Sequence, residues 1–312
     1  MRCVIGLDGG GTKTECVLLD EQQRILARTR AGASNPFRCG VAPAAAALRE
    51  AIEDALRQAQ ANPRELLAIV AALAGAGRPE LAAAMHAELL RAYPHSKIKI
   101  ITDLEAALAA MDAGPALVLV AGTGSAAIGR DSAGRVLRGG GHGAFTGDEG
   151  SAQDIGRQAL AAILHERQAG RSDAPLERAI LQELSFSSWR DLQSIASDAV
   201  DDTYPRACRA VLQSAGAGDP LAQTLLREAA GHLVHLAAAL AAQLALGGIP
   251  FRLGKTGGLC GRNDFFNQLL DELLRQALPQ AIIVPLPRTA GEAAALLALQ
   301  LIAQKTAQAD HR

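Results

Sequence analysis

A glycine-rich segment near the N-terminus has the residue types and spacing to bind a phosphate. It runs from Asp8 to Thr14 and contains, between these two residues, Gly9, Gly10, Gly11, Thr12 and Lys13. Glycines let the backbone approach a ligand closely and present its N–H groups to it. The hydroxyls and the ammonium add donors for an anion, and Asp8 is placed to hold a metal ion, through water. The segment therefore predicts a site for phosphate and Mg²⁺, which makes a nucleotide the expected ligand.

Apolar runs on either side predict that this segment joins two strands. Residues 4–7 precede it and residues 16–19 follow it, which indicates strand, turn, strand. The dinucleotide fingerprint G-x-G-x-x-G and the P-loop both lead into a helix, so neither describes this segment. A turn without a ligand is the alternative, but a hairpin needs only about two loop residues. Three glycines between an acid and T-K-T exceed what a turn requires.

A second glycine cluster repeats the pattern about a third of the chain later. Residues 117–121 predict a buried strand, and residues 126–129 resume extended structure. Between them lie Gly122, Thr123, Gly124 and Ser125. Two such hairpins predict two similar domains that face one nucleotide.

Three segments resemble motifs of one superfamily of nucleotide-binding proteins. Asp8–Thr14 resembles the first phosphate motif of the actin, Hsp70 and sugar kinase superfamily, and residues 121–125 resemble the second. Residues 256–261, which include Gly257 and Gly258, resemble the adenosine motif. From about residue 5 to about residue 299 the chain resembles the N-acetylglucosamine kinase branch of the BadF/BadG/BcrA/BcrD ATPase family. This resemblance implies ATP and Mg²⁺ as cofactors.

The same resemblance implies an α/β fold of two ribonuclease H-like, actin-like ATPase domains with a nucleotide and sugar cleft between them. We expect the first domain at 1–113 and the second at 114–290, with a C-terminal helix at about 291–312 that packs back on the first. The order of elements along the chain agrees, because the pattern β-β-β-α-β-α-β-α occurs twice, with insertions.

Hydrophobic patterning and turn residues predict the elements that must position these segments. In the first domain, strands are expected at 24–31, 67–74 and 97–101, and helices at 42–59, 79–93 and 104–111. In the second, strands are expected at 116–121, 125–130, 135–139, 251–253 and 282–284, and a long helix at 220–246. A final helix is expected at 291–307, and the stretch 170–202 is expected to be the least regular.

A base for the acceptor hydroxyl is expected at Asp103. Phosphoryl transfer needs charge neutralisation on the phosphates, in-line alignment and a base near the attacking hydroxyl. Asp103 follows the strand-like residues 97–101, at the carboxyl end where α/β sheets place their ligands. It resembles the strand-end aspartate that serves as base in sugar kinases of this family. Local sequence alone favours an N-cap for the helix that follows, and the resemblance favours the base.

Residues 139–151 resemble the sugar-binding segment of N-acetylglucosamine kinases, which ends in the same G-D-E-G-S. The resemblance makes Asp148 the carboxylate that accepts hydrogen bonds from sugar hydroxyls. An N-cap at Asp148 or Ser151 is the alternative. Gly141 and His142 fall where the family has a Gly-Trp pair against the sugar. Because His142 replaces the tryptophan, glucosamine stays open as the substrate.

The pair Ser34–Asn35 resembles the asparagine loop with which the family reaches the sugar. It is followed by Pro36, so an ordinary Asn-Pro turn is the alternative. Together with the other matches, the pair is expected to contribute to sugar binding.

Composition narrows the class of function and the setting. The chain has 312 residues, enough for two domains, and its formal net charge of -1 gives no sign of nucleic acid or an anionic membrane as partner. His232, His235 and Gln243 interrupt the alanine-rich residues around 236–242, so a packed helix is expected there and not a membrane span. No signal peptide is visible. Five scattered cysteines without a C-x-x-C pair fit a reducing cytoplasm, and they lack the spacing for the iron–sulfur cluster of the family's activator branch.

The resemblance and the residues together predict a cytoplasmic, ATP-dependent amino-sugar kinase. The expected acceptor is the 6-hydroxyl of N-acetylglucosamine, with Asp103 as base and sugar contact. The expected partner is a small-molecule amino sugar, and the resemblance implies a homodimer. Three alternatives stay open: a glucosamine kinase, an ATPase that activates another enzyme and has no sugar site, and a noncatalytic sugar sensor.

Overall fold

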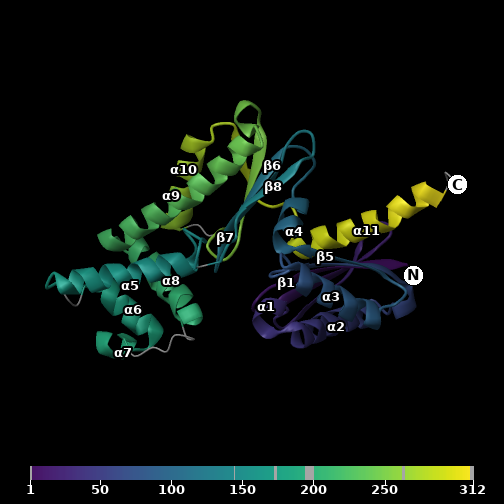
Figure 1. The fold of residues 1–312 in the computed structure, drawn as a ribbon, viewed down its shortest axis with the longest axis horizontal. Coiled ribbons are helices and arrows are strands. Elements are labelled where there is room, and N and C mark those ends of the chain that lie inside the picture. Colours follow the sequence, from purple (N-terminus) through teal and green to yellow (C-terminus); the bar gives the residue numbers. More distant parts are fainter. Residues whose placement is uncertain (1, 144, 172–173, 194–199, 262–263, 310–312) are drawn as a thin grey trace. The chain divides into compact units, whose positions relative to one another are not determined.

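The chain folds into two compact units. The structure, a computed structural model, describes residues 2–143, 145–171, 174–193, 200–261 and 264–309. Unit 1 comprises Met1–Asp112 and Leu286–Arg312, and unit 2 comprises Ala113–Pro285. Each unit is built around a five-stranded sheet with helices packed on it (Figure 1).

The sheet of unit 1 has the strand order β3-β2-β1-β4-β5. The first three strands form an antiparallel meander, whereas β4 pairs with β1 and β5 pairs with β4 in parallel. The strands are β1 (Cys3–Gly9), β2 (Thr14–Asp20), β3 (Ile25–Ala31), β4 (Leu66–Leu73) and β5 (Lys97–Thr102). The hairpin predicted for the first glycine segment is confirmed, because that segment joins β1 to β2.

Helices cover both faces of this sheet. One face carries α1 (Pro36–Cys39), α2 (Val41–Gln58) and α3 (Pro79–Ala92), and the other carries α4 (Asp103–Ala109) and α11 (Ala290–Ala309) (Figure 1). Because side chains alternate along a strand, Ile5 packs on the α2 side of β1 and Val4 packs on the α11 side. A methyl group on Gly6 would lie 2.0 Å from the backbone nitrogen of Ala295. The backbone of α11 therefore packs directly on the central strand.

The sheet of unit 2 has the order β10-β9-β6-β7-β8, which is the order of unit 1 read from its other edge. Again the first three strands form an antiparallel meander, and the last two pair in parallel. The strands are β6 (Ala116–Ala121), β7 (Ser125–Arg130), β8 (Val136–Gly140), β9 (Phe251–Thr256) and β10 (Ala281–Val284). The repeated meander predicted from the second glycine cluster is confirmed.

The helices of unit 2 enclose one continuous apolar cluster that includes Leu117, Leu233 and Phe266. They are α5 (Ala152–Gln168), α6 (Pro175–Leu184), α7 (Trp189–Gln193), α8 (Val200–Gly216), α9 (Pro220–Gln243) and α10 (Phe265–Ala277). The stretch 170–202, which was expected to be the least regular, contains the short helices α6 and α7. Residues 172–173 and 194–199 of that stretch lie outside the described residues.

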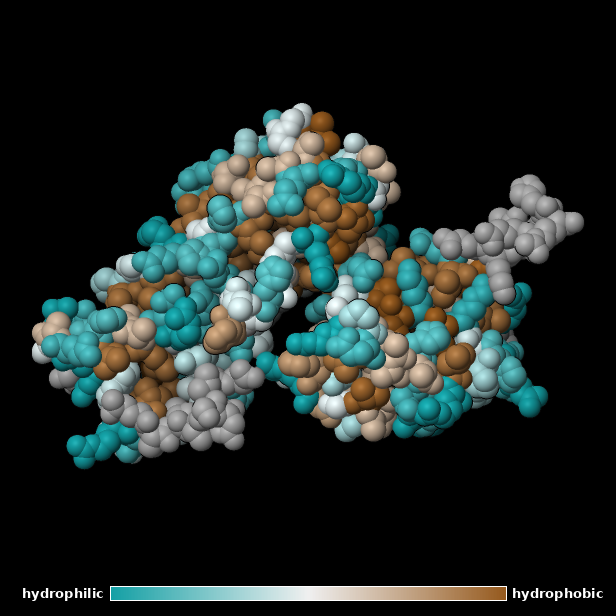
Figure 2. Space-filling view, in the orientation of Figure 1, coloured by the Kyte–Doolittle hydropathy of each residue, from teal (hydrophilic) through white to brown (hydrophobic). Residues whose placement is uncertain are grey.

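The long helix expected at 220–246 ends earlier, at Gln243. Ala245 adopts a left-handed conformation, with φ of 54°, and a short 3-10 turn follows at Leu246–Gly248. None of the helices in the described ranges is long and apolar enough to cross a membrane. Leu296, Leu297 and Leu299 of α11 are half-buried and pack against the cluster that contains Val4. Both units show patches of apolar surface among hydrophilic side chains (Figure 2).

Candidate functional site

The first glycine hairpin is a tight loop with its polar groups outward. Gly9 pairs with Thr14, and the N–H of Gly10 donates to the carbonyl oxygen of Lys13 at 3.0 Å. Gly11, Thr12 and Lys13 are exposed. The loop thus presents the ammonium and one hydroxyl to solvent, as a phosphate-binding loop requires.

Asp8 lies at the end of β1, beside this loop, in an environment that disfavours its charge. Burial raises the pKa of Asp8 to about 6, the nearby carboxylates of Asp103 and Glu15 add to the rise, and the Lys13 ammonium opposes it. A bound cation would relieve this unfavourable charge, and carboxylate oxygen is the ligand that Mg²⁺ prefers. In the described residues no three His, Cys, Asp or Glu side chains gather as a metal site. One or two carboxylates with substrate phosphates are the usual magnesium ligands in kinases.

Asp103 is the first residue of α4, at the carboxyl end of β5. Thr102 is the N-cap: its hydroxyl accepts from the N–H of Glu105 at 3.2 Å, and the Glu105 carboxylate accepts from the N–H of Thr102 at 2.8 Å. The N-cap that local sequence allowed at Asp103 is therefore one residue earlier. Asp103 Oδ1 accepts only a local bond, from the N–H of Leu104 at 3.0 Å among the bonds described. Burial raises the pKa of this carboxyl group.

The loop that contains Ser34 and Asn35 packs on the first hairpin. The N–H groups of both residues donate to the carbonyl oxygen of Gly10, at 3.0 and 3.1 Å. Ser34 is fully buried, whereas Asn35 is half-buried and caps α1 by accepting from the N–H of Phe37 at 3.0 Å. A methyl group on Gly75 would lie 2.7 Å from Asn35 Oδ1. The structure therefore brings the phosphate hairpin and the predicted sugar loop together.

The second hairpin contacts the N-terminus of α5. Gly122 N–H donates to the carbonyl oxygen of Gly124 at 2.9 Å and closes the turn between β6 and β7. The carbonyl oxygens of Gly122 and Thr123 accept from the N–H groups of Ala152 and Gln153, at 2.9 and 3.3 Å. The N-terminus of a helix favours an anion nearby. The arrangement suits a phosphate at this turn.

Asp148 lies in the sugar-type segment with a strained backbone and an unsatisfied oxygen. Its φ of 59° is in the left-handed region, which costs free energy for a residue other than glycine. Ser151, not Asp148, is the N-cap of α5, since its hydroxyl accepts from the N–H of Asp154 at 3.2 Å. Asp148 Oδ1 is buried and has no hydrogen-bond partner within the described residues. Burial raises the pKa of this carboxyl group, whereas the backbone N–H groups of Ser125 and Gly143 lower it in part.

Gly141 and His142 belong to the same segment and are exposed. The carbonyl oxygen of His142 accepts from Thr146 Oγ1 at 3.1 Å, which closes the loop between them. Both predicted residues are thus at the surface of unit 2, on the loop that leads to Asp148.

The adenosine-type motif lies against the second hairpin. Gly257 has a φ of 104°, and a methyl group there would lie 2.3 Å from the carbonyl oxygen of Ala121, so only glycine fits. The same oxygen accepts from the N–H of Leu259 at 3.0 Å. A methyl group on Gly122 would lie 3.4 Å from the nitrogen of Gly258. The structure therefore places the two motifs of unit 2 side by side, although they are more than a hundred residues apart in the sequence.

Two residues that the sequence analysis missed lie against these loops. A methyl group on Gly11 would lie 3.5 Å from Arg38 Cδ, so this exposed arginine of α1 borders the first hairpin. Asn267 of α10 donates from Nδ2 to the carbonyl oxygen of Leu259 at 2.8 Å. A basic residue shortly after the Asn-Pro pair was a signal for the first. No local pattern identified the second.

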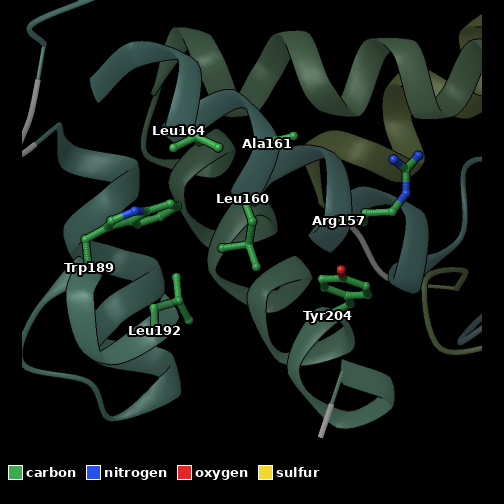
Figure 3. A pocket seen from close by; sticks show the side chains of 7 residues that line it. All are labelled: Arg157, Leu160, Ala161, Leu164, Trp189, Leu192 and Tyr204. Carbon is green, nitrogen blue, oxygen red and sulfur yellow. The ribbon is translucent and has the colours of Figure 1, made fainter. Parts of the chain in front are cut away.

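A pocket of about 300 Å³ opens elsewhere in unit 2, among α5, α7 and α8 (Figure 3). It is lined mainly by apolar and aromatic side chains, namely Arg157, Leu160, Ala161, Leu164, Trp189, Leu192 and Tyr204. Arg157 forms an ion pair with Asp154 at 2.8 Å. None of the predicted site residues lines this pocket, so it is not where phosphoryl transfer is expected.

The repeated sheet order and the paired glycine hairpins define the class of protein: a two-domain actin-like ATPase fold, as in sugar kinases. The chain belongs to the BadF/BadG/BcrA/BcrD ATPase family, whose profile matches residues 5–298.

Relatives in this family include kinases of amino sugars. The chain is 28% identical to the N-acetylmuramic acid/N-acetylglucosamine kinase of Clostridium acetobutylicum, over 96% of this chain and 98% of that protein. It is 27% identical to the glucosamine kinase of Vibrio cholerae, over 75% of this chain and 78% of that protein. The crystal structure of a proposed N-acetylglucosamine kinase from Chromobacterium violaceum has a TM-score of 0.79 and 28% identity, and the match covers 96% of this chain and 99% of that one.

Proposed function

We propose that the chain is an amino-sugar kinase that transfers the γ-phosphate of ATP to the 6-hydroxyl of N-acetylglucosamine. The observation that carries the proposal is the position of Asp103 at the carboxyl end of β5, with helix capping left to Thr102. Its carboxylate is therefore available as a base. Full-length similarity to amino-sugar kinases supports the choice of acceptor class.

Each loop has a stated role in this proposal. The first hairpin and Thr123 of the second donate to the phosphates of ATP, and Gly257 and Gly258 line the adenine and ribose pocket. Asn35 and Asp148 bind sugar hydroxyls, with Gly141 and His142 beside the sugar. Ser34 is buried, so it belongs to the loop that presents Asn35.

Asp103 accepts the proton of the attacking hydroxyl as the new phosphorus–oxygen bond forms. The environment that raises its pKa also raises its basicity, which brings it nearer to the range useful for a general base. Asp8 is the residue that would hold Mg²⁺, in part through water. When bound, Mg²⁺ would neutralise charge on the transferring phosphate.

A glucosamine kinase is the second candidate. His142 stands at the position where similar N-acetylglucosamine kinases have tryptophan. A relative with 27% identity is a glucosamine kinase. An imidazole ring is smaller and more polar than an indole ring, so this sugar site has less apolar surface for the acetamido methyl group. Free glucosamine is therefore the competing acceptor.

A coupled assay of ADP release with Mg²⁺-ATP tests the proposal. The acceptors are N-acetylglucosamine, glucosamine, N-acetylmannosamine, N-acetylmuramic acid, glucose and no sugar. Turnover that depends on N-acetylglucosamine supports the proposal, and phosphorus NMR of the product then identifies the phosphorylated hydroxyl. Turnover without sugar would point to an activator ATPase. Tight sugar binding without turnover would point to a sensor.

A further inference from the structure

Thr14 and Ser125 occupy equivalent positions in the two units. Each is the first residue of the second strand of its meander, directly after the glycine hairpin, since Thr14 begins β2 and Ser125 begins β7. Their exposed fractions are only 0% and 4%. A buried hydroxyl must find a hydrogen-bond partner inside the protein, and in both units that partner lies in the segment after the third strand.

In unit 1 the Thr14 hydroxyl binds the loop after β3. Thr14 Oγ1 donates to the carbonyl oxygen of Gly32 at 2.7 Å and lies 2.7 Å from Ser34 Oγ. A threonine hydroxyl has one proton. Because that proton goes to Gly32, Ser34 is the donor in the second bond. With the two backbone bonds from this loop to Gly10, the hairpin and the loop before Asn35 form one hydrogen-bonded structure.

In unit 2 the Ser125 hydroxyl makes the corresponding bond. Ser125 Oγ donates to the carbonyl oxygen of Glu149 at 2.8 Å, and its own carbonyl oxygen accepts from the N–H of Gly141 at 2.9 Å. A methyl group on Gly124 would lie 2.5 Å from Asp148 Oδ2. The second hairpin is therefore in direct contact with the carboxylate proposed to bind the sugar.

We infer that Thr14 and Ser125 are positioning residues, each of which fixes the sugar-contacting segment of its unit to the phosphate hairpin of that unit. The inference rests on the proposed function, which assigns the hairpins to phosphate and the segments to the sugar. Both hydroxyl protons are used inside the protein, so neither is left to donate to a phosphate oxygen. Nucleotide that orders a hairpin then lowers the entropic cost of ordering the sugar segment, which couples the two ligands positively.

Matched variants separate this role from a general loss of stability. Thr14→Val and Ser125→Ala remove the two hydroxyls, and Thr14→Ser keeps the first. The controls are Thr29→Val and Ser96→Ala. These buried hydroxyls of unit 1 also donate to backbone carbonyls, at 2.7 and 2.6 Å, but lie outside the hairpins.

Hydrogen exchange with and without a nonhydrolysable ATP analogue and Mg²⁺ is the measurement. In the wild type, the analogue slows amide exchange in both hairpins and in residues 32–35 and 148–151. In Thr14→Val the protection at residues 32–35 is expected to fall about tenfold, and in Ser125→Ala the protection at residues 148–151 is expected to fall by the same factor. This is the effect expected for the loss of one buried hydrogen bond. Protection at the hairpins is retained. Thr14→Ser and both controls behave as the wild type. In parallel, the KM for N-acetylglucosamine rises about tenfold while the Kd of the ATP analogue changes by less than about twofold.

Three outcomes overturn the inference. In the first, Thr14→Val and Ser125→Ala leave the protection of the sugar segments unchanged. In the second, these variants lose as much protection at the hairpin as at the segment. In the third, the analogue gives the segments of the wild type no protection. Exchange is measured without sugar, so its result does not depend on whether the chain phosphorylates an amino sugar. A wild type that phosphorylates no amino sugar contradicts that function, and the exchange pattern still decides the role of the two hydroxyls.

Discussion

Thr102 and Asp103 are adjacent polar residues at the start of α4, and only Thr102 caps the helix. The hydroxyl caps α4, and the carboxylate one residue later, which we propose as the base, takes no part in the cap. Unit 2 repeats the division at α5, where Ser151 caps the helix and Asp148 keeps a buried oxygen without a partner in the described residues. In both units the hydroxyl supplies the capping stabilisation, so the aspartate can be replaced without loss of the helix start.

Asp103→Asn is therefore expected to remove the base and keep the fold. The variant should lose about 10²-fold or more in kcat, with thermal unfolding and the binding of ATP and sugar close to wild type. Steady-state kinetics and calorimetric titration check this. The control is Asp54→Asn, at a half-buried position of α2 where the carboxylate pairs with Arg57. Near-normal turnover of Asp103→Asn would remove it from the role of base.

The pH dependence of stability tests the environment of Asp8. Its pKa is raised from 3.8 to about 6, so the folded state favours the neutral acid. This preference for the neutral Asp8 contributes fully to the stability of the folded state below about pH 4. The contribution is lost as the pH rises through about 6. At pH 8 without Mg²⁺, Asp8→Asn should be more stable than the wild type by on the order of 3 kcal/mol.

Thermal unfolding in EDTA at pH 4 and pH 8 measures this difference. The gain should be absent at pH 4, and Mg²⁺ should raise the stability of the wild type alone. A variant that is no more stable at pH 8 would show that the Asp8 carboxylate is compensated in the protein itself.

At the scale of elements, α10 anchors the adenosine-type motif. Asn267 is buried and donates to the carbonyl oxygen of Leu259, and Leu259 in turn donates to Ala121 at the end of β6. The loop is thus held between a helix on one side and a strand on the other. Its backbone geometry depends on a side chain that follows it in the sequence.

Asn267→Leu should raise the KM for ATP roughly five- to tenfold, because it leaves a buried carbonyl without a partner. The KM for the sugar should stay unchanged. Gln276→Leu, at an exposed position of the same helix, is the control. If both KM values rise together, the effect is on the fold of unit 2 and not on the nucleotide loop.

The elements also show what the sequence could and could not predict. Alternating apolar runs and glycine turns predicted both meanders, because these patterns act over a few residues. Residues such as Asn267 and Arg38 gain their places from contacts between distant segments, and no local pattern encodes those. The sequence also led us to expect Thr14 and Ser125 to face the nucleotide. Only the packed structure shows that their hydroxyls are buried. Resemblance supplied Asp103, which local sequence alone placed at the cap.

At the scale of the whole molecule, unit 1 is assembled from both ends of the chain. Val4, Val17 and Val70 are fully buried on the side of the sheet that α11 covers. Arg288 and Asp112, where the two stretches meet, form an ion pair at 3.4 Å. The two stretches can therefore be joined by a short linker without unit 2.

A chain of residues 1–112 joined to 286–312 should fold as a cooperative unit, whereas residues 1–112 alone should not. Burial of each valine contributes about 1.5–3 kcal/mol, and the loss of three is comparable to the total stability of a small domain. Circular dichroism and thermal unfolding of the joined chain and of residues 1–112 alone check this. Cooperative unfolding of 1–112 alone would contradict the essential role of α11.

The close packing of α11 on Gly6 has a consequence in time. On the ribosome β1 is made before α11, and all of unit 2 is synthesised between them. At about 5–20 residues per second, the valine face of the first sheet waits roughly 10 to 35 seconds for its cover. During that interval the nascent chain exposes an apolar sheet surface, which is the kind of surface that chaperones bind. Folding of the first unit is thus completed only after unit 2 has been synthesised.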